Sequence, residues 1–161
     1  MTKFSVRGIA TEHVDRLRHG GPDANGQLPL VSRAQAGGNP CRHCLRLIED
    51  GDEKLILSYR PFETAQPYAE TGPIFLHRTA CRRYEGDSLP PWFAYLQPAI
   101  IRGYDREDWI RYDTGHIVPG PELATTCEKI LSDSTVAYVH IRSKFNCFQC
   151  RVDRADAAAA A

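Results

Sequence analysis

The chain has 161 residues, of which 42% are hydrophobic and 25% are charged. A chain of this length normally builds one hydrophobic core, and this composition excludes a disordered or fibrous protein. Twenty Lys and Arg residues balance twenty Asp and Glu residues, so no overall field favours a nucleic acid or an anionic membrane surface as the partner. We therefore expect a single domain over residues 1–154.

The two ends of the chain carry further expectations. Residues 1–7 lack the apolar stretch of a signal peptide, and no segment reaches the ~20 apolar residues of a membrane span. The sequence therefore predicts a cytoplasmic protein, in which the six cysteines are reduced thiols. Residues 155–161 are nearly all alanine and predict a disordered tail.

Several short segments show the alternation or the bounded apolar runs that are typical of strands. Residues 3–9 alternate, and residues 28–31 form an apolar patch in a loop rich in Gly and Pro, which predicts an edge strand there. Further strands are predicted over residues 53–59, 73–77, 99–104 and 108–112.

One main helix is predicted to begin at Pro121 and to end near Ser134, since Pro suits a first helical turn. An apolar stripe supports it, formed by Leu123, Cys127, Ile130 and Leu131. Residues 135–142 and 147–152 then flank a short connection, as the strands of a hairpin do. The fold class predicted is α+β, with a mostly antiparallel sheet.

The cysteines and one histidine have the spacing of metal ligands. Cys41 and Cys44 form a CxxC pair, and His77 and Cys81 follow, four positions apart. We expect the second pair on one face of a short helix, after a hairpin. This order resembles the treble-clef zinc finger, although treble clefs more often have a spacing of two residues in the second pair. Three thiolates and one imidazole complete a structural zinc site and leave no position for water.

Two alternatives to this zinc site stay open. The same residues can be reduced, buried cysteines beside a histidine at a strand end. A second CxxC, Cys147 and Cys150, can join Cys41 and Cys44 in a four-thiolate site if the hairpin bends there. Cys127 lies on the apolar stripe of the helix and is predicted to be core.

Tyr138, His140 and Arg142 fall on one face of a predicted strand. Such a stripe is typical of a solvated sheet surface. It is also able to bind an anion if the face is concave and if Arg60 and Tyr68, from the loop at residues 60–70, complete a pocket.

Segments along nearly the whole chain are similar to a small bacterial family, catalogued as domain of unknown function 1203. They are residues 40–42, 56–62, 67–75, 102–105, 137–140 and 147–154. The resemblance carries no established activity. It implies that the positions of Cys41 and Cys147 are kept, while counterparts of Cys44, His77 and Cys81 are often absent, so that a metal is an added feature of some members.

Two hypotheses about function follow. The first is a cytosolic binding or interaction domain, not an enzyme, whose zinc is held by Cys41, Cys44, His77 and Cys81. The second is a small-anion binder or a thiol-dependent enzyme, which uses Arg60, Tyr68, His140, Arg142 and Cys147, with Cys147 as the nucleophile. The sequence names no substrate, no partner and no oligomeric state.

Overall fold

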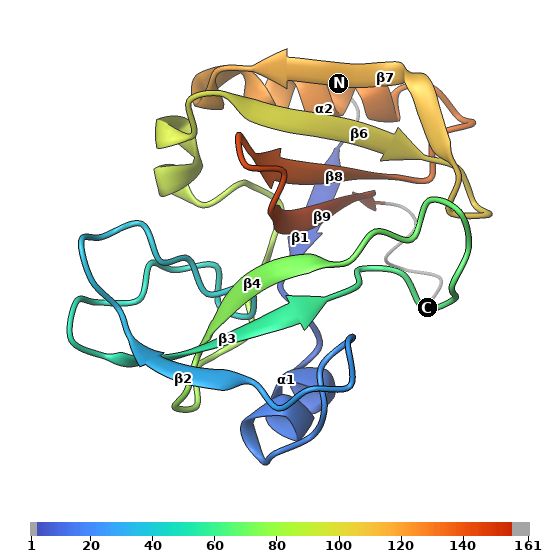
Figure 1. The fold of residues 1–161 in the computed structure, drawn as a ribbon. Coiled ribbons are helices and arrows are strands. Elements are labelled where there is room, and N and C mark those ends of the chain that lie inside the picture. Colours follow the sequence, from blue (N-terminus) through green and yellow to red (C-terminus); the bar gives the residue numbers. More distant parts are fainter. Residues whose placement is uncertain (1–2, 156–161) are drawn as a thin grey trace. The chain divides into compact units, whose positions relative to one another are not determined.

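The structure, a computed structural model, describes residues 3–155 and forms two compact units (Figure 1). The sheet unit comprises the chain up to Arg7 and from Glu85 onward, and the knuckle unit comprises Gly8–Tyr84. The prediction of one domain over residues 1–154 stays a prediction. Of the predicted tail, residues 156–161 lie outside the described residues. Among the described residues, no helix has the length and apolar character needed to cross a membrane.

The sheet unit is built on a six-stranded sheet in the order β5-β1-β9-β8-β6-β7, in which all pairs are antiparallel. Its strands are β1 (Phe4–Arg7), β5 (Glu85–Gly86), β6 (Ala99–Tyr104), β7 (Ile110–Val118), β8 (Tyr138–Ser143) and β9 (Phe148–Arg154). A 3-10 helix, η1 (Pro91–Tyr95), precedes β6. The predicted hairpin of β8 and β9 is confirmed.

The predicted main helix is confirmed as α2 (Leu123–Leu131), which follows a 3-10 turn, η2 (Gly120–Glu122). Its buried stripe is the predicted one: Leu123, Cys127, Ile130 and Leu131. In Figure 1 the helix runs along one face of the sheet, and it contacts β6, β8 and β9. Arg154 donates hydrogen bonds to the carbonyl oxygens of Leu131 and Val136, and so connects the end of β9 to the end of the helix.

β7 is longer than the strand predicted at residues 108–112, and a break in register lies between β6 and β7. The Thr114 hydroxyl accepts a hydrogen bond from the Gly103 N–H at 2.7 Å. A Cβ on Gly103 would lie only 2.8 Å from that oxygen. The side chain of Thr114 therefore occupies the space beside Gly103 where another residue would have its Cβ. Its hydrogen bond stabilises the pairing of β6 and β7 next to the break in register.

The knuckle unit contains a three-stranded antiparallel sheet in the order β2-β3-β4, with the strands β2 (Leu30–Arg33), β3 (Glu53–Tyr59) and β4 (Gly72–His77). The edge strand predicted near residues 28–31 is confirmed as β2. The unit also contains a helix that the sequence did not predict, α1 (Thr11–Arg18). Only Val14 and Leu17 of this helix are buried, which is too short an apolar pattern to identify from the sequence. With this addition, the α+β fold class is confirmed.

One core lies inside the knuckle unit and draws on α1, β3, β4 and the loops between them. It consists of Ile9, Val14, Leu17, Ala34, Cys41, Cys44, Ile48, Leu55, Leu57, Ile74 and Leu76. Cys81 packs against this core. Two of the four candidate ligands are therefore members of the core, and a third contacts it.

Candidate metal centre

Cys41 and Cys44 lie in a tight turn that two backbone hydrogen bonds close. The Cys41 N–H donates to the Arg46 carbonyl oxygen, and the Leu45 N–H donates to the Cys41 carbonyl oxygen, both at 2.9 Å. Leu45 adopts a φ of 53°, the left-handed conformation that reverses the chain. Both sulfurs accept backbone hydrogen bonds, Cys41 from the Cys44 N–H and Cys44 from the Arg46 N–H. The turn thus presents two sulfurs on one side, as in a zinc knuckle.

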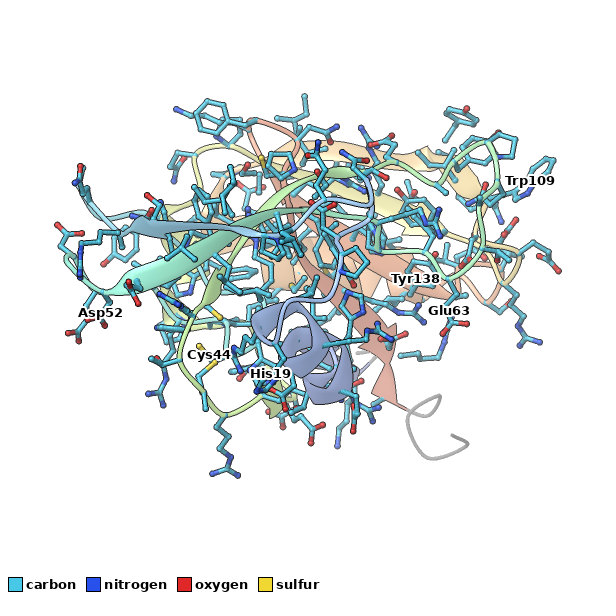
Figure 2. The ribbon with its side chains drawn as sticks, turned by 60° about the horizontal axis from the view of Figure 1, so that its bottom comes forward. His19, Cys44, Asp52, Glu63, Trp109 and Tyr138 are labelled. Atoms are coloured by element: carbon cyan, nitrogen blue, oxygen red, sulfur yellow. The ribbon has the colours of Figure 1, made fainter. Side chains whose placement is uncertain are left out.

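His77 and Cys81 reach the same point from another segment. The knuckle runs beside β4, because Cys41 forms a parallel bridge with Phe75. The His77 N–H donates to the Cys41 sulfur at 3.3 Å. Figure 2 shows Cys44 with other sulfur atoms next to it, beside the helix that His19 follows.

The short helix expected for His77 and Cys81 is absent, and that expectation is wrong. His77 is the last residue of β4, and Cys81 lies in the loop that follows. The polar groups of this loop bond to other segments: the Tyr84 N–H donates to the His43 carbonyl oxygen at 2.9 Å, and the Arg83 side chain to the Gly8 carbonyl oxygen at 2.8 Å. The loop is therefore held extended, without the internal bonds of a helix.

The ligand atoms of Cys41, Cys44, His77 and Cys81 all lie within 4.8 Å of one another. The sulfurs of Cys41 and Cys81 are 3.9 Å apart, and the Cys44 sulfur lies 3.4 Å from His77 Nδ1. A tetrahedral zinc ion, with bonds of about 2.3 Å to sulfur and about 2.0–2.1 Å to nitrogen, separates two sulfurs by about 3.8 Å and sulfur from nitrogen by about 3.6 Å. The group can hold a metal ion, and the two distances, 3.9 Å and 3.4 Å, are close to those of a zinc site.

The electrostatics of the group also favour a cation. A hydrogen bond from the Cys44 thiol, with another from Cys81, lowers the pKa of Cys41. Donating its own S–H to Cys41 raises the pKa of Cys44, and the hydrogen bond with Cys41 raises the pKa of His77 to about 9. The three sulfurs lie too close together for all of them to ionise unless a positive charge joins them.

Two side chains that are not candidate ligands lie within hydrogen-bond distance of the Cys81 sulfur. Arg18, at the end of α1, donates from Nη2 to the Cys81 sulfur at 3.1 Å and from Nε to the His77 carbonyl oxygen at 3.0 Å. His43 Nδ1 also lies 3.1 Å from this sulfur, and its Nε2 lies 3.0 Å from the Thr11 hydroxyl. Burial lowers the pKa of His43, so its imidazole is neutral. Sequence reasoning did not identify Arg18, His43 and Thr11 as neighbours of the candidate ligands. The one signal in the sequence was the position of His43 between Cys41 and Cys44.

Residues 38–154 match the model of a protein family described as Protein of unknown function (DUF1203). The chain belongs to this family. The matched region includes all four candidate ligands, whereas Thr11 and Arg18 precede it. A search of curated proteins and a search of solved structures each found no match.

The polar stripe predicted on β8 in this DUF1203 chain is not a solvated surface. Tyr138, His140 and Arg142 are only 2%, 0% and 4% exposed. The His140 ring lies 4.7 Å from the ring of Tyr104, 5.2 Å from that of Tyr138 and 5.0 Å from that of Phe148. Burial, with the charge of Arg142 beside it, holds the pKa of His140 well below its usual value. The imidazole is therefore neutral near pH 7, and it lacks the charge that we expected to attract an anion.

The remaining predicted ligand-binding residues are divided between the two units of the DUF1203 chain. Arg60 and Tyr68 belong to the knuckle unit, whereas His140, Arg142 and Cys147 belong to the sheet unit. Their convergence on one ligand stays a prediction. Within the knuckle unit, the Arg60 side chain donates a hydrogen bond to the Phe62 carbonyl oxygen at 3.3 Å.

The other cysteines of the DUF1203 chain have different surroundings from the four-ligand cluster. Cys127 is fully buried on α2, as predicted, and burial raises its pKa to about 12. Cys150 is buried in β9, and Cys147 is half-buried just before that strand. The alternative site with four thiolates would combine these last two residues with the knuckle, and it stays a prediction.

Proposed function

We propose that the protein is a binding or interaction domain of the cytoplasm, and that the knuckle unit holds one structural zinc ion. The observation that carries this proposal is the meeting of three sulfurs and one imidazole nitrogen within 4.8 Å. Thiolate and imidazole together are the donor set of structural zinc, while calcium and magnesium take oxygen ligands. The residues that would hold the ion are Cys41, Cys44, His77 and Cys81.

Four protein ligands make a closed site. A catalytic zinc keeps one position for water or substrate, and this donor set leaves none. Zinc in such a site supplies folding energy, because the ligands are brought together only in the folded chain.

The test is elemental analysis of protein purified in buffers free of added metal. We expect about one zinc per chain, and removal of the zinc by a chelator should lower the unfolding temperature. Calorimetry before and after chelation measures this change, and adding zinc back should reverse it. Protein that contains no metal and unfolds at the same temperature with and without the chelator would contradict the proposal.

A further inference from the structure

Cys81 differs from the other two thiolates of the metal centre in its accessibility. Cys41 and Cys44 are buried, whereas Cys81 is half-buried. Of the three cysteines, Cys81 is therefore the residue that is most open to a small electrophile in solution. It is also the sulfur that receives hydrogen bonds from the side chains of Arg18 and His43.

The Arg18 guanidinium is held firmly at this sulfur. Its side chain is 7% exposed, and its Nη1 lies 3.4 Å from an oxygen of Asp15. A second hydrogen bond, from Nε to the His77 carbonyl oxygen, fixes the plane of the group. Three thiolates and a neutral imidazole around a divalent ion leave one negative charge, and the guanidinium balances it.

His43 supplies the second donor through a short relay. His43 Nδ1 lies 3.1 Å from the Cys81 sulfur, and its Nε2 lies 3.0 Å from the Thr11 hydroxyl. Because a Cys81 thiolate has no proton to donate, this contact requires the imidazole proton on Nδ1, and Nε2 then accepts a hydrogen bond from the Thr11 hydroxyl. Thr11 and Arg18 are the first and last residues of α1. One helix therefore arranges both donors, directly through Arg18 and indirectly through Thr11.

We propose that α1, acting through Arg18 and His43, shields the Cys81 thiolate from electrophiles and so keeps the metal centre chemically inert. Arg18 and His43 are positioning residues in this inference, which rests on the proposed zinc site. A sulfur lone pair that is engaged in an N–H···S bond is less available to attack, and the Cys81 sulfur has two such partners. When the shield is removed, an alkylating agent attaches carbon to the sulfur. The resulting thioether is uncharged, and it binds the metal more weakly.

The probe is iodoacetamide, with which the sulfur forms a bond to carbon as the carbon–iodine bond breaks and iodide leaves. We compare the zinc-loaded wild-type chain with Arg18→Gln, which removes the charge, and Arg18→Lys, which keeps it. Arg16→Gln is the matched control, because Arg16 is an exposed residue of the same helix whose guanidinium bonds to His13. Mass spectrometry locates the modified cysteine, and a metal-sensitive dye follows zinc release.

In Arg18→Gln, iodoacetamide should alkylate Cys81 about tenfold faster than in the wild type, because one charge-assisted hydrogen bond to the sulfur is lost. Zinc should be released in parallel. Arg18→Lys should lie between the two, and Arg16→Gln should match the wild type. Cys147, in the other unit, serves as an internal reference whose rate should not change. Equal Cys81 rates in Arg18→Gln and the wild type would overturn the shielding role.

A spectroscopic measurement separates this inference from the proposed function. With cobalt(II) in place of zinc, Arg18→Gln should move the sulfur-to-cobalt charge-transfer band to lower energy, because the thiolate becomes a stronger donor. Thr11→Val, which removes the relay hydroxyl, should give a smaller shift in the same direction, and it serves if Arg18→Gln does not fold. Cobalt bound with unshifted bands in both variants overturns the shield alone, whereas a wild-type chain that binds neither metal overturns the zinc site and the shield together.

Discussion

The two units of the molecule use antiparallel strands in the same way and fill their interiors differently. In the sheet unit, β8 and β9 bring apolar side chains onto α2, and Val139, Ile141, Val152 and Leu131 are all fully buried. In the knuckle unit, the core is assembled on three strands and one short helix, and Cys41 and Cys44 are part of it. Apolar packing stabilises the first unit, while in the second two candidate metal ligands, Cys41 and Cys44, take positions in the core.

This difference indicates how each unit responds to a change. A unit packed by apolar side chains loses stability in proportion to the volume removed. A unit whose core contains metal ligands depends on every member of the set, because three ligands do not hold the ion as four do. The following predictions test this contrast, in order of decreasing effect.

The largest effect is expected from Cys44→Ser. Loss of one thiolate should remove the zinc and destabilise the knuckle unit by more than about 5 kcal/mol, since the binding energy of a structural zinc is folding energy. Hydrogen exchange measured by mass spectrometry should show faster exchange in residues 8–84 and little change in β8 and β9. Cys127→Ala is the control. Replacing this buried cysteine should reduce only the apolar packing and leave the zinc content unchanged. Exchange that rises equally in both units would show one cooperative domain and remove the contrast.

The next largest effect is expected from Leu131→Ala in the sheet unit. Leu131 is fully buried at the end of α2, and alanine preserves the helix while leaving a cavity. We expect a loss of about 3 kcal/mol in the free energy of unfolding. Urea denaturation measures the loss, and elemental analysis should find the same zinc content as in the wild type. Zinc lost from this variant would show that the metal site depends on the core of the sheet unit.

Sequence reasoning succeeded where the local sequence pattern and the tertiary contacts favour the same secondary structure. β3 and β6 have the bounds predicted for them, because each is an apolar run with turn residues on both sides. The four residues of the cluster that can hold a metal ion were likewise picked out from their types and spacing. In β3 and β6 the local residues determine the bounds of the strand, and in the cluster the residue types alone indicate the chemistry.

The failures have a common physical cause, since each depends on a contact with a distant segment. α1 has only two buried residues, and its ends are fixed by Thr11 and Arg18 through groups some thirty and sixty positions away. The burial of His140 requires aromatic rings from β6 and β9. Neither contact leaves a periodic signal in the sequence.

A smaller effect, dependent on pH, is expected from the buried His140. The charged groups that affect its pKa, Arg142, Arg151 and Arg102, are all cations and oppose its protonation, as burial does. Because the pKa of the folded state lies below that of the unfolded state, the unfolded chain binds the extra proton first. Stability should therefore be complete above pH ~6.5 and fall by about 1.4 kcal/mol per pH unit below it.

His140→Phe isolates this effect, because an aromatic ring of similar size remains beside Tyr104 and Phe148. Urea denaturation at several pH values should give a shallower acid slope for the variant than for the wild type. The comparison cancels the acid sensitivity of the metal ligands, which both proteins share. Identical slopes would show that His140 keeps its ordinary pKa, and the anion-binding hypothesis would then regain the positive charge of this imidazole in acid, next to that of Arg142.

The smallest effect is expected from Arg78→Gln, although Arg78 is adjacent to the ligand His77. Its guanidinium forms an ion pair with Glu53 at 2.8 Å, and the two side chains are 48% and 37% exposed. Exposed pairs of this kind contribute from zero to about 1 kcal/mol, because water and salt screen them. The variant should keep its zinc and unfold within about 1 kcal/mol of the wild type, with the difference shrinking in high salt. A large loss of stability or of zinc in urea denaturation and elemental analysis would mean that this surface charge acts on the metal ligands. The stability of the knuckle unit would then be sensitive to substitutions outside the four candidate ligands.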